Sequence, residues 1–317
     1  MGKREPHVGN PAVTAFLGTW LARKKKLVLV TGRRSYVQCG AESFFLPFLR
    51  GKNVLHLETV GENARSEDVA AKQRLVADWG VPDAFVAVGG GTVIDTTKLL
   101  RGLDRLHPFL AVPTTAGTGA ESTRFAVYYD QGKKKSADDV RYLPTDVVLL
   151  LDFLKTQSAY QRACTEFDAY AQAVESLWAN GATNESRAYA RRSLELHEQS
   201  QAADGESRHA FQLLASYWAG RAIDLSRTTA AHALSYYMTS HYGVPHGHAV
   251  YMMFPYVCRA NGHPEFNRVI EELSTLREFA AEKSLDWDWL VGELMANVNA
   301  QRLSNNPCPI HAEDFYE

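Results

Sequence analysis

The spacing of apolar residues divides the chain into two parts. In the first part, the runs at 26–31, 84–88 and 109–112 are almost continuous in apolar residues, as is typical of strands buried on both faces. The pattern predicts further strands at 54–60, 124–130 and 147–151, and helices at 10–21, 36–49, 67–79 and 92–103. Because strands alternate with helices, we predict a Rossmann-like α/β domain with a parallel sheet covered by helices on both faces.

Helical periodicity dominates the rest of the chain. The segments that carry it are 158–180, 185–199, 206–223, 230–241, 246–261, 264–283 and 286–303. We therefore place a domain boundary near residue 154. The expected architecture is an α/β domain over 1–154 and an all-α domain over 155–317, with a cleft between them.

The bulk composition is that of an ordinary globular protein. Of the 317 residues, 45% are hydrophobic and 22% charged, and the formal net charge is -2. With so small a net charge, we predict neither a nucleic-acid nor a membrane partner. We find no secretory signal, and no apolar run approaches the roughly 20 residues of a membrane span. The four cysteines lie far apart and form no CxxC pair, which favours reduced thiols and a cytoplasmic location.

Glycine-rich loops follow two of the buried strands. The first reads Gly89-Gly90-Gly91-Thr92 and lies between a predicted strand and a predicted helix. Glycine lets the backbone approach a phosphate closely, and the free amides of a helix start stabilise its charge. The second loop follows the next strand and reads Pro113-Thr114-Thr115-Ala116-Gly117-Thr118-Gly119. A single triple-glycine loop is also typical of a tight turn, but two such loops in succession indicate a cofactor that carries a pyrophosphate.

The residues after the first strand bear on the kind of cofactor. An acidic residue there would favour the free ribose of NADH, whereas this chain reads Gly32-Arg33-Arg34. Since arginine binds phosphate well, we predict NADPH rather than NADH. The alternative is that the two arginines form a solvated turn. The GxGxxG fingerprint of an ordinary Rossmann domain is absent.

Two histidines flank a break between helical runs. His232 lies in the first run, and His246 follows Pro245, which suits a helix start but not a helix interior. The turn can fold His246 back towards His232, and paired imidazoles at a helix junction are a common metal site. Asp168 and Gln172 share a helix face and would add one or two oxygen ligands. This set suits Fe(II), Zn(II), Co(II) or Mn(II). The alternatives are a helix-terminal charge for Asp168 and a packing amide for Gln172.

The order of these motifs resembles that of one known family. The triple-glycine loop continues as Val93-Ile94-Asp95-Thr96-Thr97-Lys98, and the second loop continues as Ala120-Glu121. Both precede the Asp168 helix and the pair of His232 and His246. Together they closely resemble the iron-containing (group III) alcohol dehydrogenases, which have a dehydroquinate synthase-like fold. The resemblance covers nearly the whole chain, as far as Pro307.

The resemblance implies a role for each motif. The first loop would hold the cofactor pyrophosphate, and the second would line the nicotinamide side. The expected cofactor contacts are Gly32, Arg33, Gly89, Gly90, Gly91, Thr92, Asp95, Thr114, Thr115 and Thr118. The expected ligands of a divalent metal, Fe(II) first and Zn(II) second, are Asp168, His232 and His246, with Gln172 as the fourth. The domain over 1–154 would then bind the dinucleotide, and that over 155–317 the metal and the substrate.

Three departures from the family pattern narrow the match. Gln172 stands where the family usually has a histidine, and Tyr236 where it often has another. The chain is short at both ends, and the last helix expected after Pro307 is nearly missing. The stretches at 171–178, 184–191 and 232–248 look like one branch, the phosphonoacetaldehyde reductases. That likeness implies reduction of phosphonoacetaldehyde to 2-hydroxyethylphosphonate in phosphonate biosynthesis.

The implied chemistry is hydride transfer from the nicotinamide to an aldehyde carbonyl that a metal ion polarises. The expected proton donor is His248, Tyr236 or bound water. His248 cannot share a helix face with His246, two residues away, so a packing or surface role is its alternative.

A dianionic phosphonate needs cations in its site. We expect Arg227 to supply the charge, with hydroxyl donors from Thr228 and Thr229. Lys134 and Lys135, from a loop after the 124–130 strand, are the second choice. Their lysine run is also typical of a solvated surface.

Other functions fit parts of the same pattern. A generic short-chain alcohol or polyol dehydrogenase would use the same scaffold, and a lyase related to dehydroquinate synthase would use NAD only transiently. A catalytically silent nucleotide-binding protein would keep the glycine loops without turnover. The expected partners are a small aldehyde and a second copy of the chain, since dimers are common in the family.

Overall fold

The described chain, residues 5–59, 61, 63–104 and 106–316 of a computed structural model, divides into two units. The first unit runs to Gln157, except for residues 116–118, and also includes Asp204–Leu213. The second unit holds Ala116–Thr118, Ser158–Ala203 and the chain from Leu214 onward. Residues 116–118 of the second glycine loop thus belong to the second unit, and the start of the helix after Asp204 belongs to the first.

A six-stranded parallel sheet organises the first unit. Its strand order is β1-β8-β5-β4-β2-β3. The bounds are β1 His7–Val8, β2 Lys26–Gly32, β3 Asn53–Thr59, β4 Ala84–Gly89, β5 Phe109–Pro113 and β8 Asp146–Leu149. In register, Thr31 pairs with Val88 and Gly89 pairs with Pro113. The carboxyl ends of β2, β4 and β5 therefore meet at one edge, where all three segments predicted to bind the cofactor begin.

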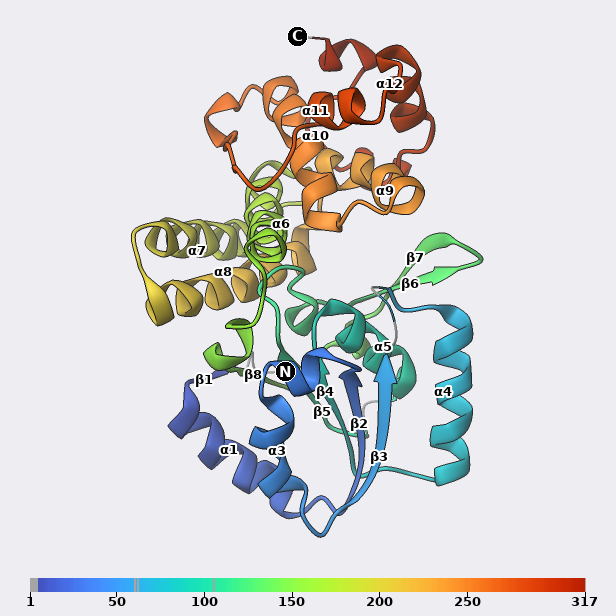
Figure 1. The fold of residues 1–317 in the computed structure, drawn as a ribbon, viewed down its shortest axis with the longest axis vertical. Helices are drawn as coiled ribbons and strands as arrows, with labels where there is room; N and C mark the ends of the chain where they lie inside the picture. The colour runs from blue at the N-terminus through green and yellow to red at the C-terminus, as the bar shows by residue number, and fades with distance from the viewer. Residues whose placement is uncertain (1–4, 60, 62, 105, 317) are drawn as a thin grey trace. The chain divides into compact units, whose positions relative to one another are not determined.

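Side chains of each strand alternate between two apolar layers, and helices cover both (Figure 1). Leu27 and Leu29 of β2 pack with Leu17 of α1 on one face, and Val28 packs with Ile94 of α5 on the other. The helices of this unit are α1 Asn10–Ala22, α2 Ser35–Gln38, α3 Ala41–Leu49, α4 Ser66–Trp79 and α5 Gly91–Arg101. This arrangement confirms the predicted α/β class.

Some predicted elements of the first unit are wrong. The helix predicted at 36–49 is interrupted, because Gly40 adopts a left-handed conformation with a φ of 79° before α3. The strand predicted at 147–151 stops at Leu149, and a 3-10 turn follows at Leu151–Leu154. Lys134 and Lys135 lie in a strand, β7 Lys133–Asp138, which pairs with β6 Phe125–Asp130, and not in a loop. The last residue of the predicted strand 54–60 lies outside the described residues.

Helices build the second unit, as predicted. They are α6 Ala159–Trp178, α7 Asn184–Gln201, α8 Gly205–Ser226, α9 Ala230–Tyr242, α10 His246–Ala260, α11 Leu276–Glu282, α12 Trp287–Ala296 and α13 Ala300–Leu303, although α8 begins in the first unit. Ser158 caps α6, and Thr183 with Ser186 forms a capping box for α7. Phe167 of α6 packs edge-to-face on Phe254 of α10, with ring centroids 5.3 Å apart, inside the main apolar cluster of the unit.

The two long helices predicted near the C-terminus are wrong. The segment 264–283 contains a 3-10 turn at Pro264–Phe266 and then α11, which begins at a capping box of Thr275 and Glu278. The segment 286–303 is split into α12 and α13, and Asn299 caps the latter. In both cases a strong helix-start signal inside the segment outweighs the overall periodicity. Among the described helices, none combines the length and apolarity needed to cross a bilayer.

Candidate functional site

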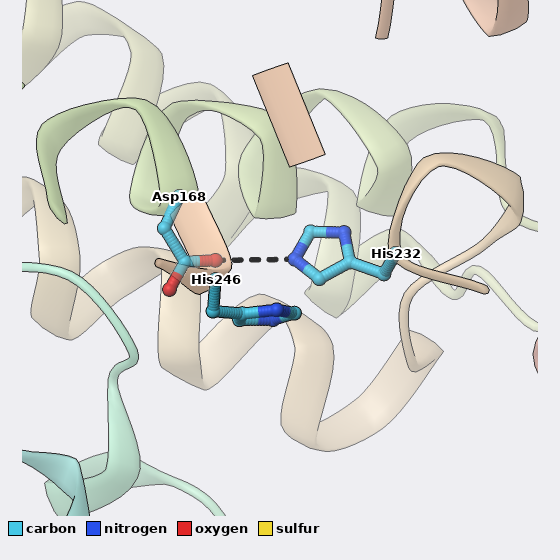
Figure 2. A group of neighbouring side chains, drawn as sticks. All are labelled: Asp168, His232 and His246. Carbon is cyan, nitrogen blue, oxygen red and sulfur yellow. Dashed lines mark hydrogen bonds and ion pairs between the residues drawn. The ribbon is translucent and has the colours of Figure 1, made fainter. Parts of the chain in front are cut away.

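Three side chains predicted to bind a metal converge in the second unit (Figure 2). They are Asp168 on α6, His232 on α9 and His246 at the start of α10, and their donor atoms all lie within 4.8 Å of one another. Nε2 of His232 is 3.2 Å from Oδ1 of Asp168, and the two imidazole rings are 5.5 Å apart. Asp168 and His232 are only 3% and 4% exposed, and His246 is half-buried. The arrangement is a largely buried cluster of two imidazoles and one carboxylate.

A glycine lets α10 begin close to α6. Pro245, with a φ of -52°, precedes the first turn of α10 and directs His246 into the cluster. A Cβ atom on Gly247 would lie 2.7 Å from the carbonyl carbon of Cys164 and closer still to its oxygen. Because no side chain fits there, this helix contact requires glycine at position 247.

Glu175 is a site residue that the sequence analysis missed. Its carboxylate is fully buried and accepts hydrogen bonds from Nδ1 of His232 at 2.5 Å, from the amide of Ala231 at 2.8 Å and from the amide of Thr229 at 3.0 Å. It therefore caps the start of α9 from a neighbouring helix and turns Nε2 of His232 towards Asp168. Its position seven residues after Asp168, on the same face of α6, is the signal that would have revealed it.

The three charged groups stabilise one another's ionised forms. Burial raises the pKa of Asp168 and of Glu175, but hydrogen bonds and the positive charge from His232 outweigh it, so both pKa values lie below their ordinary range. Burial lowers the pKa of His232, but Glu175 and Asp168 reverse this effect and raise the pKa above its ordinary value. The pocket thus favours a positive charge between two carboxylates.

Gln172 lies beside the cluster, one helical turn after Asp168. Its Nε2 donates to Oδ1 of Asp168 at 3.0 Å and to the carbonyl oxygen of Thr118 at 3.4 Å. Its Oε1 is buried and has no hydrogen-bond partner among the described residues. The side chain supports the Asp168 carboxylate, and its orphaned oxygen is the atom that could serve as a fourth ligand. The fourth-ligand role stays a prediction.

The donor set fits a divalent transition metal. Imidazole nitrogen and carboxylate oxygen are ligands that Fe(II) and Zn(II) share, and a histidine whose second nitrogen bonds a carboxylate is typical of such sites. The unpartnered oxygen of Gln172 and the carboxylate–imidazole contact of 3.2 Å both indicate a pocket arranged around a cation.

The two residues predicted as proton donors have different surroundings. Tyr236 is half-buried, and its ring lies 6.3 Å from that of His246. His248 points away from the cluster, because Nδ1 contacts the hydroxyl of Tyr160 at 2.8 Å and Nε2 contacts the carbonyl oxygen of Ser274 at 2.8 Å. With both nitrogens engaged, His248 joins α10 to α6 and to the segment before α11, while Tyr236 stays near the cluster.

The triple-glycine loop joins the end of β4 directly to the first turn of α5. Gly89 ends β4 and Gly90 caps α5 in an extended conformation. A Cβ atom on Gly89 would lie 2.7 Å from Cβ of Val93, and one on Gly90 would lie 3.1 Å from Oγ1 of Thr115. The amide of Thr114 donates to the carbonyl oxygen of Gly89 at 3.1 Å, which joins the two loops. Only glycine therefore fits at positions 89 and 90 without crowding Val93 or Thr115.

The loop residues differ in exposure. Thr114 is buried, Thr115 and Gly32 are half-buried, and Thr118 is exposed. Gly91 and Thr92 form the first turn of α5 and are half-buried. Their contacts with a cofactor stay predictions.

Asp95 lies behind the loop and not at its surface. Its carboxylate is 9% exposed, accepts from Nζ of Lys98 at 3.1 Å and from the amide of Val127 at 3.1 Å. Lys98 is fully buried and also donates to Thr123 and to the carbonyl oxygen of Phe125. Asp95 therefore ties α5 to β6, and a contact with the cofactor would need to be indirect.

The edge predicted to select NADPH carries both signs of charge. Arg33 and Arg34 are exposed after β2, and Nε of Arg33 lies 3.6 Å from Oε2 of Glu58 on the next strand. Glu58 is a second residue that the sequence analysis missed, because it lies beside Arg33 only through the pairing of β2 with β3. A carboxylate at this edge favours a free ribose, whereas the two arginines favour a phosphate.

The residues predicted to bind a phosphonate come from both units, and their role stays a prediction. Arg227 is exposed, with a left-handed φ of 64°, and directly precedes Thr228, whose side chain is buried. Thr228 accepts a hydrogen bond from Arg302. Lys134 lies in the β6–β7 hairpin of the first unit.

Comparison with known proteins supports the assignment of the fold. Two family models match consecutive stretches of the chain: iron-containing alcohol dehydrogenase over residues 8–150, and the Fe-containing alcohol dehydrogenase family, C-terminal, over residues 162–306. An iron-containing alcohol dehydrogenase of Thermotoga maritima superimposes with a TM-score of 0.81 at 23% identity, over 99% of this chain and 96% of the other.

Curated relatives match shorter stretches. A phosphonoacetaldehyde reductase of Streptomyces viridochromogenes is 34% identical over 199 residues, which are 53% of this chain and 50% of that protein. The probable alcohol dehydrogenase EutG of Escherichia coli is 30% identical over 262 residues, 73% of this chain and 64% of that protein. The chain thus spans about half of the first relative and less than two thirds of the second. With both family models matched in order and the fold shared throughout, the chain belongs to the iron-containing alcohol dehydrogenase family.

Proposed function

We propose that this protein is a metal-dependent aldehyde reductase that uses NADPH or NADH and reduces phosphonoacetaldehyde to 2-hydroxyethylphosphonate. The observation that carries the proposal is the convergence of the donor atoms of Asp168, His232 and His246, which all lie within 4.8 Å of one another. The similarity to the reductase of Streptomyces viridochromogenes supports the choice of substrate. So do Gln172 and Tyr236, which replace two histidines common in the wider family.

The three proposed metal ligands present their donor atoms together. A divalent cation held by Asp168, His232 and His246 would supply Lewis-acid polarisation of the substrate carbonyl. Glu175 holds Nδ1 of His232 and so keeps Nε2 directed into the pocket. Gln172 holds the Asp168 carboxylate in place by donating to its Oδ1. Burial of Asp168 and His232 would limit the access of bulk water to a carbonyl bound at the cluster.

The reduction needs one hydride and one proton. Reduced nicotinamide cofactor would supply the hydride, and the triple-glycine loop with the first turn of α5 would bind its pyrophosphate. As hydride adds to the carbonyl carbon, the carbonyl oxygen takes up a proton. We assign the proton donor to the hydroxyl of Tyr236, because its ring lies 6.3 Å from that of His246, whereas Tyr160 and Ser274 hold His248 away from the cluster. The products are the alcohol and the oxidised cofactor.

A spectrophotometric assay of cofactor oxidation tests the proposal. Protein loaded with Fe(II) or Zn(II) is given phosphonoacetaldehyde, acetaldehyde or propanal, each with NADPH and with NADH. We expect kcat/KM for phosphonoacetaldehyde to exceed that for propanal by on the order of 100-fold, because charged-group recognition contributes several kcal/mol. Chelation of the metal should abolish turnover.

Two other outcomes would replace the proposal. Equal turnover of all three aldehydes would indicate a generic short-chain alcohol dehydrogenase, which the likeness to the Escherichia coli protein favours. Binding of the cofactor without turnover of any aldehyde would indicate a catalytically silent nucleotide-binding protein. Sedimentation of the loaded protein would test the further proposal of a homodimer.

A further inference from the structure

An arginine that belongs to none of the sequence motifs lies near Tyr236, whose ring is the aromatic neighbour of His246. Arg302 on α13 donates through Nη1 to Oγ1 of Thr228, and its Cζ lies 5.9 Å from the ring centre of Tyr236. The Tyr236 ring lies 6.3 Å from that of His246. These two distances place the guanidinium within about 12 Å of the His246 ring.

The charge of Arg302 is not neutralised by the protein. Its side chain is half-buried, and no carboxylate of the described chain forms an ion pair with it. The guanidinium carries five N–H donors in a planar fork, and the hydroxyl of Thr228 uses one of the terminal ones. A partly buried cation with unused donors is suited to accept an anionic ligand with several oxygens.

The surroundings of Arg302 hold it in a fixed position. Its own amide donates to the side chain of Asn299, which caps α13. Nδ2 of Asn305 donates to the carbonyl oxygens of Ser226 and Thr228, at 2.9 and 3.1 Å, and so ties the segment before α9 to the segment after α13. Thr228 is only 1% exposed. A cation fixed in this way loses little conformational entropy when it binds a ligand.

We propose that Arg302, held by Thr228, is the specificity-determining residue that binds a tetrahedral oxyanion on the substrate, a phosphonate or a sulfonate attached to a short aldehyde. This inference rests on the proposed function and names the group that the site selects. From the carbonyl oxygen to an oxyanion oxygen two carbons away, with a hydrogen bond at each end, such a substrate spans roughly 10 Å. That reach lies within the upper limit of about 12 Å that these two distances set between the His246 ring and the guanidinium.

Arg302 fits this role better than the residues that the sequence pointed to. Arg227 is exposed and its backbone is left-handed, and Lys134 belongs to the other unit. Arg302 contacts both Thr228 and Tyr236. A dianionic phosphonate should bind more tightly than a monoanionic sulfonate, since the Coulomb attraction scales with charge.

The test compares Arg302→Met and Arg302→Lys with a matched control, Arg277→Met. Arg277 also stacks on an aromatic ring, that of Trp287 at 4.0 Å, and also bonds one oxygen, the carbonyl of Phe315 at 3.1 Å. We expect Arg302→Met to lower kcat/KM for phosphonoacetaldehyde by on the order of 100-fold, mainly through KM, and that for propanal less than about 3-fold. Arg302→Lys should be intermediate, and Arg277→Met should keep the wild-type ratio. Sulfoacetaldehyde, tested in parallel, shows whether the site prefers the phosphonate or the sulfonate.

Binding of the product class provides a second readout that does not depend on turnover. Calorimetry measures the affinity of metal-loaded wild type and of Arg302→Met for 2-hydroxyethylphosphonate and for 2-hydroxyethylsulfonate. Loss of binding in the variant supports the subsite, even where wild type turns over neutral aldehydes equally well and the proposed function fails. An equal loss of kcat/KM on both aldehydes, an unchanged selectivity in Arg302→Met, or no oxyanion binding by wild type would overturn the assignment of Arg302.

Discussion

An ionic cluster is buried in each of the two units, and the two clusters differ in where their positive charge comes from. The lysine cluster of the first unit consists of Asp95, Lys98 and Glu121. Nζ of Lys98 is fully buried and lies 3.1 Å from Asp95. It also donates to the hydroxyl of Thr123 and the carbonyl oxygen of Phe125. Every donor of this ammonium is used within the chain.

The histidine cluster of the second unit consists of Asp168, Glu175, His232 and His246. In the described chain, its two carboxylates pair with imidazole and with no lysine or arginine. Nε2 of His232 and Oδ1 of Asp168 face each other at 3.2 Å, with the His246 ring beside them. A buried carboxylate needs a cation, and here the chain supplies one only by protonating histidine.

The difference distinguishes a structural cluster from the proposed metal site. The lysine cluster contains its own counter-charge and therefore joins α5 to β6 permanently. The histidine cluster presents the same kind of buried charge with ligand atoms that a divalent cation can bridge. Changes that remove a charge should therefore affect folding in the first cluster and metal binding in the second.

The largest effect is expected from Asp168→Asn. This change removes the only anionic donor among the three converging residues, so divalent metal affinity should fall at least about 100-fold and kcat/KM by on the order of 1000-fold. Metal titration and the aldehyde assay measure the two effects. The matched control is Glu195→Gln, which removes an exposed carboxylate paired with Arg192. Wild-type metal affinity in Asp168→Asn would contradict the metal-site assignment.

Lys98→Met should chiefly affect folding. It leaves Asp95 buried without its cation, so the free energy of unfolding should fall by about 3–5 kcal/mol, as measured by urea denaturation. The double variant with Asp95→Asn should recover part of this loss, because no uncompensated charge remains. Metal affinity should stay unchanged. If added metal restored the stability of Lys98→Met, the lysine cluster would not differ from the histidine cluster in the way proposed.

Glu121 should make the stability of the first unit depend on pH. The side chain is 2% exposed, and burial raises its pKa from 4.5 to about 7. Between these two values the folded state holds a proton that the unfolded state has released, so the free energy of unfolding should fall as pH rises through this window, by about 3 kcal/mol in total. Glu121→Gln should remove this decline. Denaturation curves at both ends of the window test it, and an unchanged pH dependence in the variant would assign the decline to other groups.

Metal should stabilise the protein through the histidine cluster alone. At a free concentration of about 100 times its Kd, Zn(II) should raise the free energy of unfolding by about 2.7 kcal/mol. Thermal denaturation with Zn(II) and with a chelator measures the gain. The gain should disappear in Asp168→Asn and persist in Lys98→Met, and its persistence in both would place the metal elsewhere.

The sequence predicted those parts of the structure that depend on near neighbours. Continuous apolar runs identify β2, β4 and β5, because strands of a parallel sheet are buried on both faces. Pro245 marks the start of α10, and the motif order identified the three residues that converge. The prediction failed where a local start signal competed with periodicity, at Gly40, Thr275 and Asn299.

Only the tertiary structure showed which groups pair inside the protein. Glu175 reaches His232 across 57 positions in the sequence, and Arg302 reaches Thr228 across 74. The amide of Gln172 faces Asp168 and Thr118, an orientation set by two acceptors that no spacing rule places together. Hydrophobic pattern and helix caps act over a few residues, so the sequence by itself determines the elements and the residue types available for chemistry. The charge balance of a buried site depends on partners from distant helices, and that balance decides whether a carboxylate is structural or binds a cation.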